Sequence, residues 1–191
     1  MAATASTMLT LGTPCPDFRL PDPSGKLYGR DDFAAAPGLL VMFICNHCPY
    51  VKHIRTALAA LTRSYEGKIG IVAINANDAN THPDDAPPRM AEEARDAGYT
   101  FPYLFDETQE VAKVFRAACT PELYLFDGER RLYYRGQFDD SRPGNGKPVT
   151  GKDLRAAIDA LLRGDPPPRE QTPSVGCNIK WKPGNAPAYF G

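Results

Sequence analysis

The chain has 191 residues, a length that fits one domain or one slightly extended domain. Its hydrophobic and charged fractions, 42% and 24%, are those of a globular protein and exclude wholesale disorder and a fibrous repeat. The 22 Lys and Arg against 23 Asp and Glu leave a formal charge of −1, without the basic excess typical of nucleic-acid or membrane-surface binding. We therefore expect no nucleic acid and no membrane among its partners.

Cysteine usage and the N-terminal residues bear on the compartment. The N-terminal residues lack the basic flank and apolar run of a signal peptide, and no later stretch approaches the roughly 20 apolar residues of a membrane span. Five cysteines are an odd number, spread over a chain long enough to build its own core. This pattern argues against a secreted disulfide framework and favours a cytoplasmic protein whose cysteines serve chemistry or bind metal.

The first third of the chain predicts a hairpin followed by a strand and a helix. Residues 14–28 read as two short strands joined by a turn. Residues 38–44 form a continuous apolar run, typical of a strand buried on both faces. From Pro49 onward apolar residues recur at helical spacing, and proline suits the first helical position because its missing N–H would be unpaired there. The helix is therefore expected to begin beside Cys48.

The rest of the chain alternates helices and strands. A second buried strand over 68–74 completes a right-handed βαβ unit. The further predicted elements are a helix over 87–98, a helix after a capping box at 106–109, two antiparallel strands over 122–126 and 131–135, and a helix from a second capping box at 150–153 to Gly164. This order predicts an α/β domain over 1–164, with a mixed central sheet flanked by helices.

Residues 165–191 form a Pro-rich C-terminal extension. Trp181, Tyr189 and Phe190 give this tail apolar anchors, so we expect it to pack on the domain. A disordered tail is the alternative on composition alone.

Cys45 and Cys48 stand where the buried strand is followed by the helix, and α/β sheets place their sites at the carboxyl ends of strands. A thiol at a helix N-terminus is favoured as thiolate by unpaired N–H groups and by the helix dipole. Cys48 is therefore the predicted attacking thiolate, with Cys45 as its partner or as a packing residue. The spacing indicates redox chemistry, with inert core thiols and metal binding as alternatives.

His47 would lower the pKa of Cys48 when protonated, whereas the alternative is a solvent-facing loop histidine. Together with Cys45, Cys48 and His53 it has the residue types of a zinc site. The four residues lack the paired-arm spacing of such sites, and His53 falls away from the apolar stripe of its helix, as a solvated residue does. We expect neither a metal nor a cofactor.

The segment Phe43–Pro49, Phe-Ile-Cys-Asn-His-Cys-Pro, resembles the strand-to-helix active site of the thioredoxin superfamily, and the order of elements agrees over most of residues 10–163. Further segments resemble the peroxiredoxin-like branch of the alkyl hydroperoxide reductase and thiol-specific antioxidant family: Gly12–Phe18, Phe101–Gln109, Cys119–Pro121, Tyr134–Gly136 and Gly176–Trp181. The resemblance implies a thioredoxin fold with an N-terminal β-hairpin and a C-terminal extension.

Alignment on Cys48 shows which parts of the family patterns this chain keeps. The position of the second thioredoxin cysteine holds Val51. The proline and threonine of the peroxiredoxin pattern Pro-x-x-x-Thr-x-x-Cys are replaced by Val41 and Cys45, and the arginine of that family is absent. The resemblance therefore implies the attacking cysteine but not the full peroxidase site.

The resemblance also implies that Thr120 and Pro121 form a cis-proline loop, which faces the active cysteine and binds an extended substrate backbone. Cys119 would then lie within disulfide reach of Cys48, so mild oxidation is expected to join Cys48 to Cys45 or to Cys119. Cys177, in the tail, keeps two interpretations: a resolving thiol or a residue of tail packing.

The resulting interpretation is a thiol-dependent oxidoreductase that favours thiol–disulfide exchange through Cys48. Peroxiredoxin-type hydroperoxide reduction is the first alternative, and a non-catalytic peptide-binding or thiol metal-binding module is the second. The expected partners are a small disulfide or a protein disulfide, a hydroperoxide under the first alternative, and a thiol electron donor.

Overall fold

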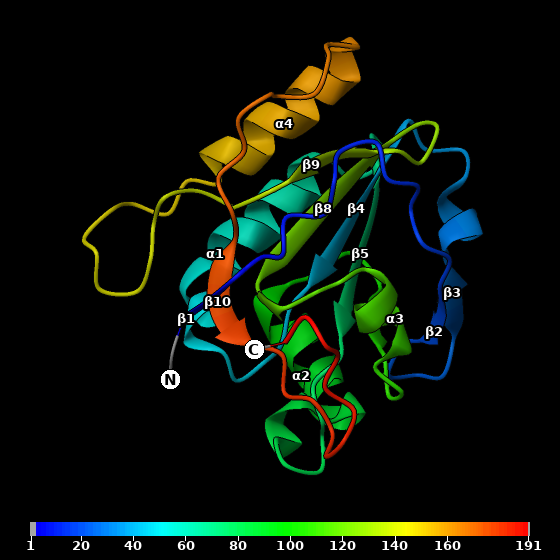
Figure 1. The fold of residues 1–191 in the computed structure, drawn as a ribbon, viewed down its shortest axis with the longest axis vertical. Helices are drawn as coiled ribbons and strands as arrows, with labels where there is room; N and C mark the ends of the chain where they lie inside the picture. The colour runs from blue at the N-terminus through cyan, green and yellow to red at the C-terminus, as the bar shows by residue number, and fades with distance from the viewer. Residues whose placement is uncertain (1–2, 191) are drawn as a thin grey trace.

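The computed structural model describes residues 3–190, and a five-stranded mixed sheet with the strand order β6-β5-β4-β8-β9 forms its centre (Figure 1). On one side of β4 the neighbours are parallel, and on the other side they are antiparallel. The strands are β4 (Gly38–Phe43), β5 (Gly70–Asn75), β6 (Tyr103–Phe105), β8 (Glu122–Asp127) and β9 (Leu132–Arg135). The predicted mixed sheet is confirmed, with β6 as an additional strand.

The central strand β4 is buried on both faces, and its side chains alternate between two cores. Leu40 and Met42 pack in the core under α1 (Pro49–Ser64) and α4 (Lys152–Arg163). Leu39, Val41 and Phe43 pack in the opposite core, beside α3 (Glu110–Val114) and the N-terminal hairpin. Each fully buried side chain of this size contributes about 1.5–3 kcal/mol. The sheet is thus packed between helices on one face and α3 with the N-terminal hairpin on the other.

Helix α1 begins at Pro49, as predicted, with Cys48 as its N-cap residue. Its buried stripe runs through Val51, Ile54 and Leu58, which fixes the rotation of the helix against the sheet. Helix α2 (Pro87–Ala97) ends at a left-handed glycine, Gly98, with φ 70°. Its only buried residue, Met90, joins the core under α1.

Both predicted capping boxes are wrong. The N-cap residues of α3 and α4 are Gln109 and Gly151, which have φ values of 66° and 65° and give no side-chain cap. The N–H of Ala112 in α3 is bound by Asp106 Oδ2 at 2.8 Å, and the N–H of Gly151 by Asp139 Oδ2 at 2.7 Å. These helix starts are therefore capped by carboxylates at longer sequence separations than a capping box has.

A second, three-stranded antiparallel sheet joins both ends of the chain to the central domain. Its order is β1 (Ala3–Ala5), β10 (Val175–Asn178) and β7 (Cys119–Thr120). In Figure 1, β10 runs beside β1 near the start of α1. The sequence did not predict any of these strands, because each is short and its partners are distant in the chain. A separate hairpin of β2 (Arg19–Pro21) and β3 (Leu27–Gly29) confirms the predicted N-terminal hairpin.

The C-terminal extension contacts the core opposite α1. Ile179 is buried in that core and Trp181 packs against it. The rings of Trp181 and Phe190 meet edge to face at 6.3 Å, and Tyr189 Oη donates to the carbonyl of Ala117 at 3.1 Å. The three aromatic residues of the extension thus all make contacts within the protein.

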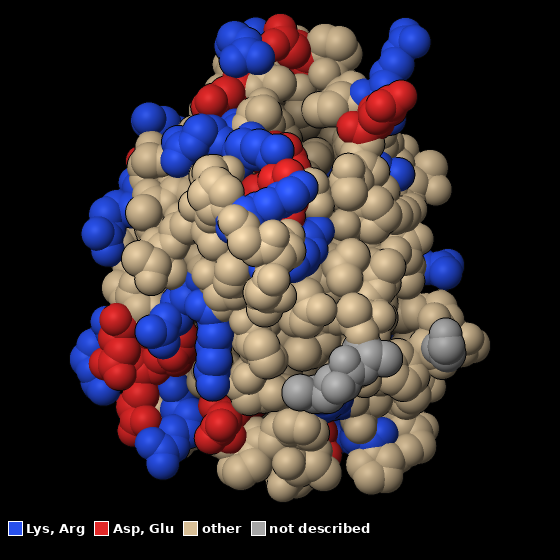
Figure 2. All heavy atoms as spheres, turned by 90° about the vertical axis from the view of Figure 1, so that its left-hand side faces the viewer, with Lys and Arg blue, Asp and Glu red and all other residues tan. Residues whose placement is uncertain are grey.

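Figure 2 looks at the side of the molecule that lies on the left in Figure 1, where basic and acidic side chains gather close together. Asp140 pairs with both Lys147 and Lys152, and Arg55 pairs with Glu93.

Among residues 3–190, the structure contains no helix with the length and apolar character of a membrane span.

Candidate active site

Cys48 lies at the junction of β4 and α1 and is fully buried, with 0% exposure. Its thiol donates to the carbonyl of Thr120 at 3.2 Å, and the Thr120–Pro121 peptide bond is cis. The central sheet brings the two segments together because β8, which follows Pro121, pairs directly with β4. The structure therefore places the predicted thiolate against the predicted cis-proline loop.

Cys45 lies on the same loop, and its Sγ is 3.2 Å from the hydroxyl of Thr120. Burial raises its pKa well above the ordinary range, and the hydrogen bond with Cys48 and the charge of Asp85 raise it further. Cys45 therefore keeps its proton at neutral pH. A protonated thiol beside Cys48 can donate to a Cys48 thiolate.

The pKa of Cys48 is shifted in the opposite direction. A hydrogen bond from Cys45, opposed by burial and aided by hydrogen bonds from Cys177 and the Val51 N–H, lowers its pKa to about 5. The Thr120 carbonyl can accept a hydrogen bond only from the protonated Cys48 thiol, so this bond is lost when Cys48 ionises. The donors from Cys45, Cys177 and Val51 nevertheless lower the pKa of Cys48. At neutral pH Cys48 is therefore a thiolate, the form that attacks disulfides and peroxides.

Asp85 holds the loop between the two cysteines. It ends a short 3-10 helix (Pro83–Asp85) and is fully buried. Its carboxylate accepts the N–H of Asn46 at 2.7 Å and the side-chain amide of Asn77 at 2.9 Å, and it lies 2.5 Å from His47 Nδ1. Burial alone would raise the pKa of Asp85, but these hydrogen bonds together lower it. The carboxylate fixes the backbone at Asn46 and the ring of His47.

His47 is therefore bound to Asp85 on one side and stacks on His82 at 4.7 Å on another. Within residues 3–190 no hydrogen bond joins His47 to Cys48. The groups that lower the Cys48 pKa are thiols and backbone N–H groups instead. His47 therefore helps to fix the loop between Cys45 and Cys48 and does not contact the thiolate directly.

Cys45, His47 and Asp85 each place one ligand-type atom within 4.8 Å of the others. Hydrogen bonds account for all three, since Cys45 contacts Thr120 and His47 contacts Asp85. His53, the fourth member of the zinc set suggested by residue type, contacts Ser141 Oγ at 2.7 Å instead. The structure therefore does not bring that set together, and His53 is half-buried against Ser141 rather than fully solvated.

Cys119 precedes the cis-proline loop and is fully buried. Its Sγ lies 3.7 Å from the Pro121 carbonyl and 3.8 Å from Glu122 Oε2. Burial, and then the Glu122 carboxylate, raise the Cys119 pKa well above the ordinary range. Its surroundings therefore disfavour the thiolate that a resolving cysteine needs.

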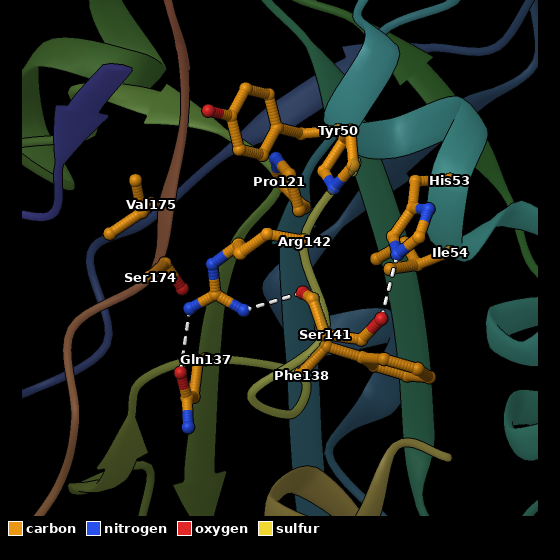
Figure 3. Close-up of a pocket in the computed structure, with 11 residues that line it drawn as sticks. Tyr50, His53, Ile54, Pro121, Gln137, Phe138, Ser141, Arg142, Ser174 and Val175 are labelled. Carbon is orange, nitrogen blue, oxygen red and sulfur yellow. Dashed lines mark hydrogen bonds between the residues drawn. The ribbon is translucent and has the colours of Figure 1, made fainter. Parts of the chain in front are cut away.

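Strand β10 occupies the edge of β7, and Cys177 stands opposite Thr120 in the register. The resemblance assigned this loop to an extended substrate backbone, whereas the structure fills its edge with the protein's own C-terminal strand. Figure 3 shows a hollow beside this strand, lined among others by Tyr50, Pro121 and Val175. Arg142 crosses it and donates to Gln137 Oε1 at 2.6 Å.

The sequence analysis missed Asp85, and for Cys177 it left a resolving thiol and tail packing both open. A signal for Asp85 existed, because it follows β5, and the carboxyl ends of parallel neighbours lie at one edge of a sheet. For Cys177 the only signal was the resemblance of Gly176–Trp181, which gives no register.

Two substitutions of Cys45 test its role as a donor. Cys45→Ala should raise the Cys48 pKa by about 1–2 units, because a hydrogen bond to a charged group contributes about 1.5–3 kcal/mol. Cys45→Ser keeps an O–H donor and should shift it less. The measurement is the ultraviolet absorbance of the thiolate against pH. Cys15→Ala is the control, because burial raises the Cys15 pKa to about 12. An unchanged midpoint in Cys45→Ala would remove Cys45 from the donor set.

A crystal structure of a hypothetical protein from Sinorhizobium meliloti 1021 is 53% identical, with a TM-score of 0.93 over 95% of this chain and 100% of that chain. An uncharacterized conserved protein from Geobacillus kaustophilus is 51% identical, with a TM-score of 0.93 over 96% and 98%. A comparison with curated protein sequences finds no significant match.

The thioredoxin domain of a thiol-disulfide oxidoreductase from Bacteroides vulgatus is 16% identical, with a TM-score of 0.62 over 81% of this chain and 99% of that chain. This similarity confirms the predicted thioredoxin fold. The match to a family model supports a thiol-dependent redox function. The model of the AhpC/TSA family matches residues 11–135, more than half of the chain, so the predicted resemblance is confirmed and the protein belongs to the AhpC/TSA family.

Proposed function

We propose that the protein is a thiol–disulfide oxidoreductase in which Cys48 is the attacking thiolate. The observation that carries this proposal is the environment of Cys48 at the N-terminus of α1, with a pKa of about 5 and with Thr120 and the Cys45 thiol beside it. A stable thiolate is the nucleophile of disulfide exchange. A structural cysteine buried in an apolar core would have a raised pKa instead.

The reaction begins when the Cys48 thiolate attacks one sulfur of a substrate disulfide, R–S–S–R′. A Cys48–S–S–R bond forms, and R′S⁻ leaves with the electron pair of the broken bond. A second thiolate then attacks Cys48 Sγ and releases RS⁻, so the substrate gains two electrons and the protein holds a disulfide. A thiol donor reduces this disulfide and completes the cycle.

The residues around Cys48 favour a disulfide over a hydroperoxide as the substrate. Peroxide reduction needs donors that stabilise the charge developing on the peroxide oxygens. Val41 is an apolar core residue, and Pro121 has no N–H. The Cys45 thiol and the Thr120 hydroxyl already contact each other. Disulfide exchange needs chiefly the thiolate, which the site supplies.

The proposed partners are a small or protein disulfide and a thiol electron donor. The odd number of cysteines favours a reducing compartment such as the cytoplasm, where protein thiols persist. Tyr50, half-buried in the hollow of Figure 3 that Pro121 also lines, offers apolar surface for the substrate beside the cis-proline loop.

Parallel assays test the choice of substrate. With excess dithiol, the protein should reduce a small disulfide measurably, and its consumption of hydrogen peroxide should be on the order of a hundredfold slower than that of an enzyme with the missing donors. Stopped-flow oxidation of Cys48 by peroxide at peroxidase-like rates, without disulfide turnover, would assign peroxide reduction instead. Absence of both activities, together with zinc in the purified protein, would favour the metal-binding alternative.

A further inference from the structure

We propose that Cys177 is the second redox thiol and forms an intramolecular disulfide with Cys48. This inference rests on the proposed function and names the residue that resolves Cys48. It assigns a chemical role to β10, which lies outside the segment matched by the family.

The backbone of β10 sets the position of Cys177. In the antiparallel register, Cys177 stands opposite Thr120, the residue whose carbonyl accepts the Cys48 S–H at 3.2 Å. The pairing continues with the Ile179 N–H, which donates to the Ala118 carbonyl at 3.0 Å. On its other edge β10 pairs with β1. A strand paired on both edges holds its side chains at fixed positions.

Gly176 allows an unusually close approach of β10 to the cis-proline loop. A Cβ at this position would lie 1.9 Å from the carbonyl oxygen of Thr120 and 2.6 Å from its carbonyl carbon. Any side chain at position 176 is therefore excluded, and Cys177 follows directly. The Cys48 and Cys177 thiols are close enough for each to shift the pKa of the other, and both are buried, at 0% and 3% exposure.

Charge distinguishes Cys177 from the two other cysteines near Cys48. Asp85 opposes ionisation of Cys45, and Glu122 opposes ionisation of Cys119. Burial and the hydrogen bond to Cys48 raise the Cys177 pKa to about 12, but Lys180 acts in the opposite direction. Once Cys48 is bound in a disulfide, its negative charge no longer opposes a Cys177 thiolate. The same relief reaches Cys45 and Cys119, but among the causes of the three pKa shifts a nearby cation that favours the thiolate, Lys180, acts only on Cys177.

Cys177 loses its proton, and its thiolate attacks Cys48 Sγ in the mixed disulfide Cys48–S–S–R. The bond to R breaks, RS⁻ leaves with the electron pair and takes up a proton, and a Cys48–S–S–Cys177 bond remains. Because Cys48 has no exposed surface while β10 is paired, the proposed step also requires β10 to move aside before the substrate can reach Cys48. Return of β10 to β7 then brings Cys177 onto the mixed disulfide.

The stoichiometry of thiol release tests this step in the full chain. The reduced protein is treated with one equivalent of a symmetric small disulfide whose released thiol is coloured, and its peptides are mapped without reduction after alkylation. We expect two equivalents of thiol from the wild type and a Cys48–Cys177 peptide pair. Cys177→Ser should release one equivalent and retain R on Cys48. Cys15→Ser is the matched control and should behave as the wild type.

The outcomes separate the inference from the proposed function. A Cys48–Cys45 or Cys48–Cys119 pair in the wild type, with two equivalents still released by Cys177→Ser, would overturn the role of Cys177 and leave the function of Cys48 intact. Failure of Cys48 to form any mixed disulfide would overturn both. The wild-type peptide map decides the pairing even where Cys177→Ser folds poorly.

Discussion

Replacing Cys48 by serine should abolish both disulfide reduction and peroxide consumption. A serine hydroxyl is not ionised at neutral pH, so the hydrogen bonds that stabilise the thiolate have no anion to act on. Loss of a catalytic nucleophile costs on the order of 10⁶ in kcat in a well-studied case, which would leave only the uncatalysed background here. The measurement is the rate of small-disulfide reduction with excess dithiol, for Cys48→Ser and the wild type at equal concentration.

Cys15→Ser is the matched control for this experiment. Cys15 lies in the core opposite α1, its thiol contacts the Pro16 carbonyl, and burial raises its pKa to about 12. A folded Cys15→Ser variant should therefore retain the activity. Retained turnover in Cys48→Ser, or its loss only in Cys15→Ser, would show that another thiol attacks the substrate.

Replacing Gly176 by alanine should produce the second large effect, on stability and on the disulfide together. The added Cβ meets the backbone of Thr120 at 1.9 Å, and a backbone atom in a paired strand cannot yield as a flexible side chain does. Overpacking typically costs about 1–3 kcal/mol and occasionally more. We expect a lower free energy of unfolding in urea and loss of the Cys48–Cys177 disulfide after oxidation.

Gly128→Ala controls for the general effect of a glycine substitution. Its Cβ would meet the Pro37 carbonyl oxygen at 3.3 Å, a contact that a small shift relieves. The free energy of unfolding should fall less than in Gly176→Ala. Equal losses in the two variants, with the disulfide still formed in Gly176→Ala, would contradict the close approach of β10 to the cis-proline loop.

The elements predicted well from sequence are those with a long periodic signal. The apolar run of β4 and the helical stripe of α1 each specify their own structure, and Pro49 fixes the start of the helix. β6 and β7 have three and two residues, too few for a periodic pattern to appear. Their strand character comes from distant partners, which a local pattern does not encode.

In the candidate site, too, some positions can be predicted from the sequence and others cannot. The positions of Cys48 and the cis-proline loop follow from the order of elements and the family resemblance. The contact of His53 with Ser141 depends on a loop 88 residues further along the chain, so a helical wheel predicts solvent there. The register that sets Cys177 opposite Thr120 depends on the path of the tail, which helical or strand periodicity does not specify.

The pairing of β10 with β7 makes the C-terminal segment a tethered competitor for any external peptide. A tethered segment acts at an effective concentration that reaches the millimolar range for short flexible links. An external peptide that takes the β7 edge would bind only molecules with β10 displaced, so its apparent Kd would equal the intrinsic Kd divided by the displaced fraction. A partner that displaces β10 would raise peptide affinity and Cys48 accessibility by the same factor.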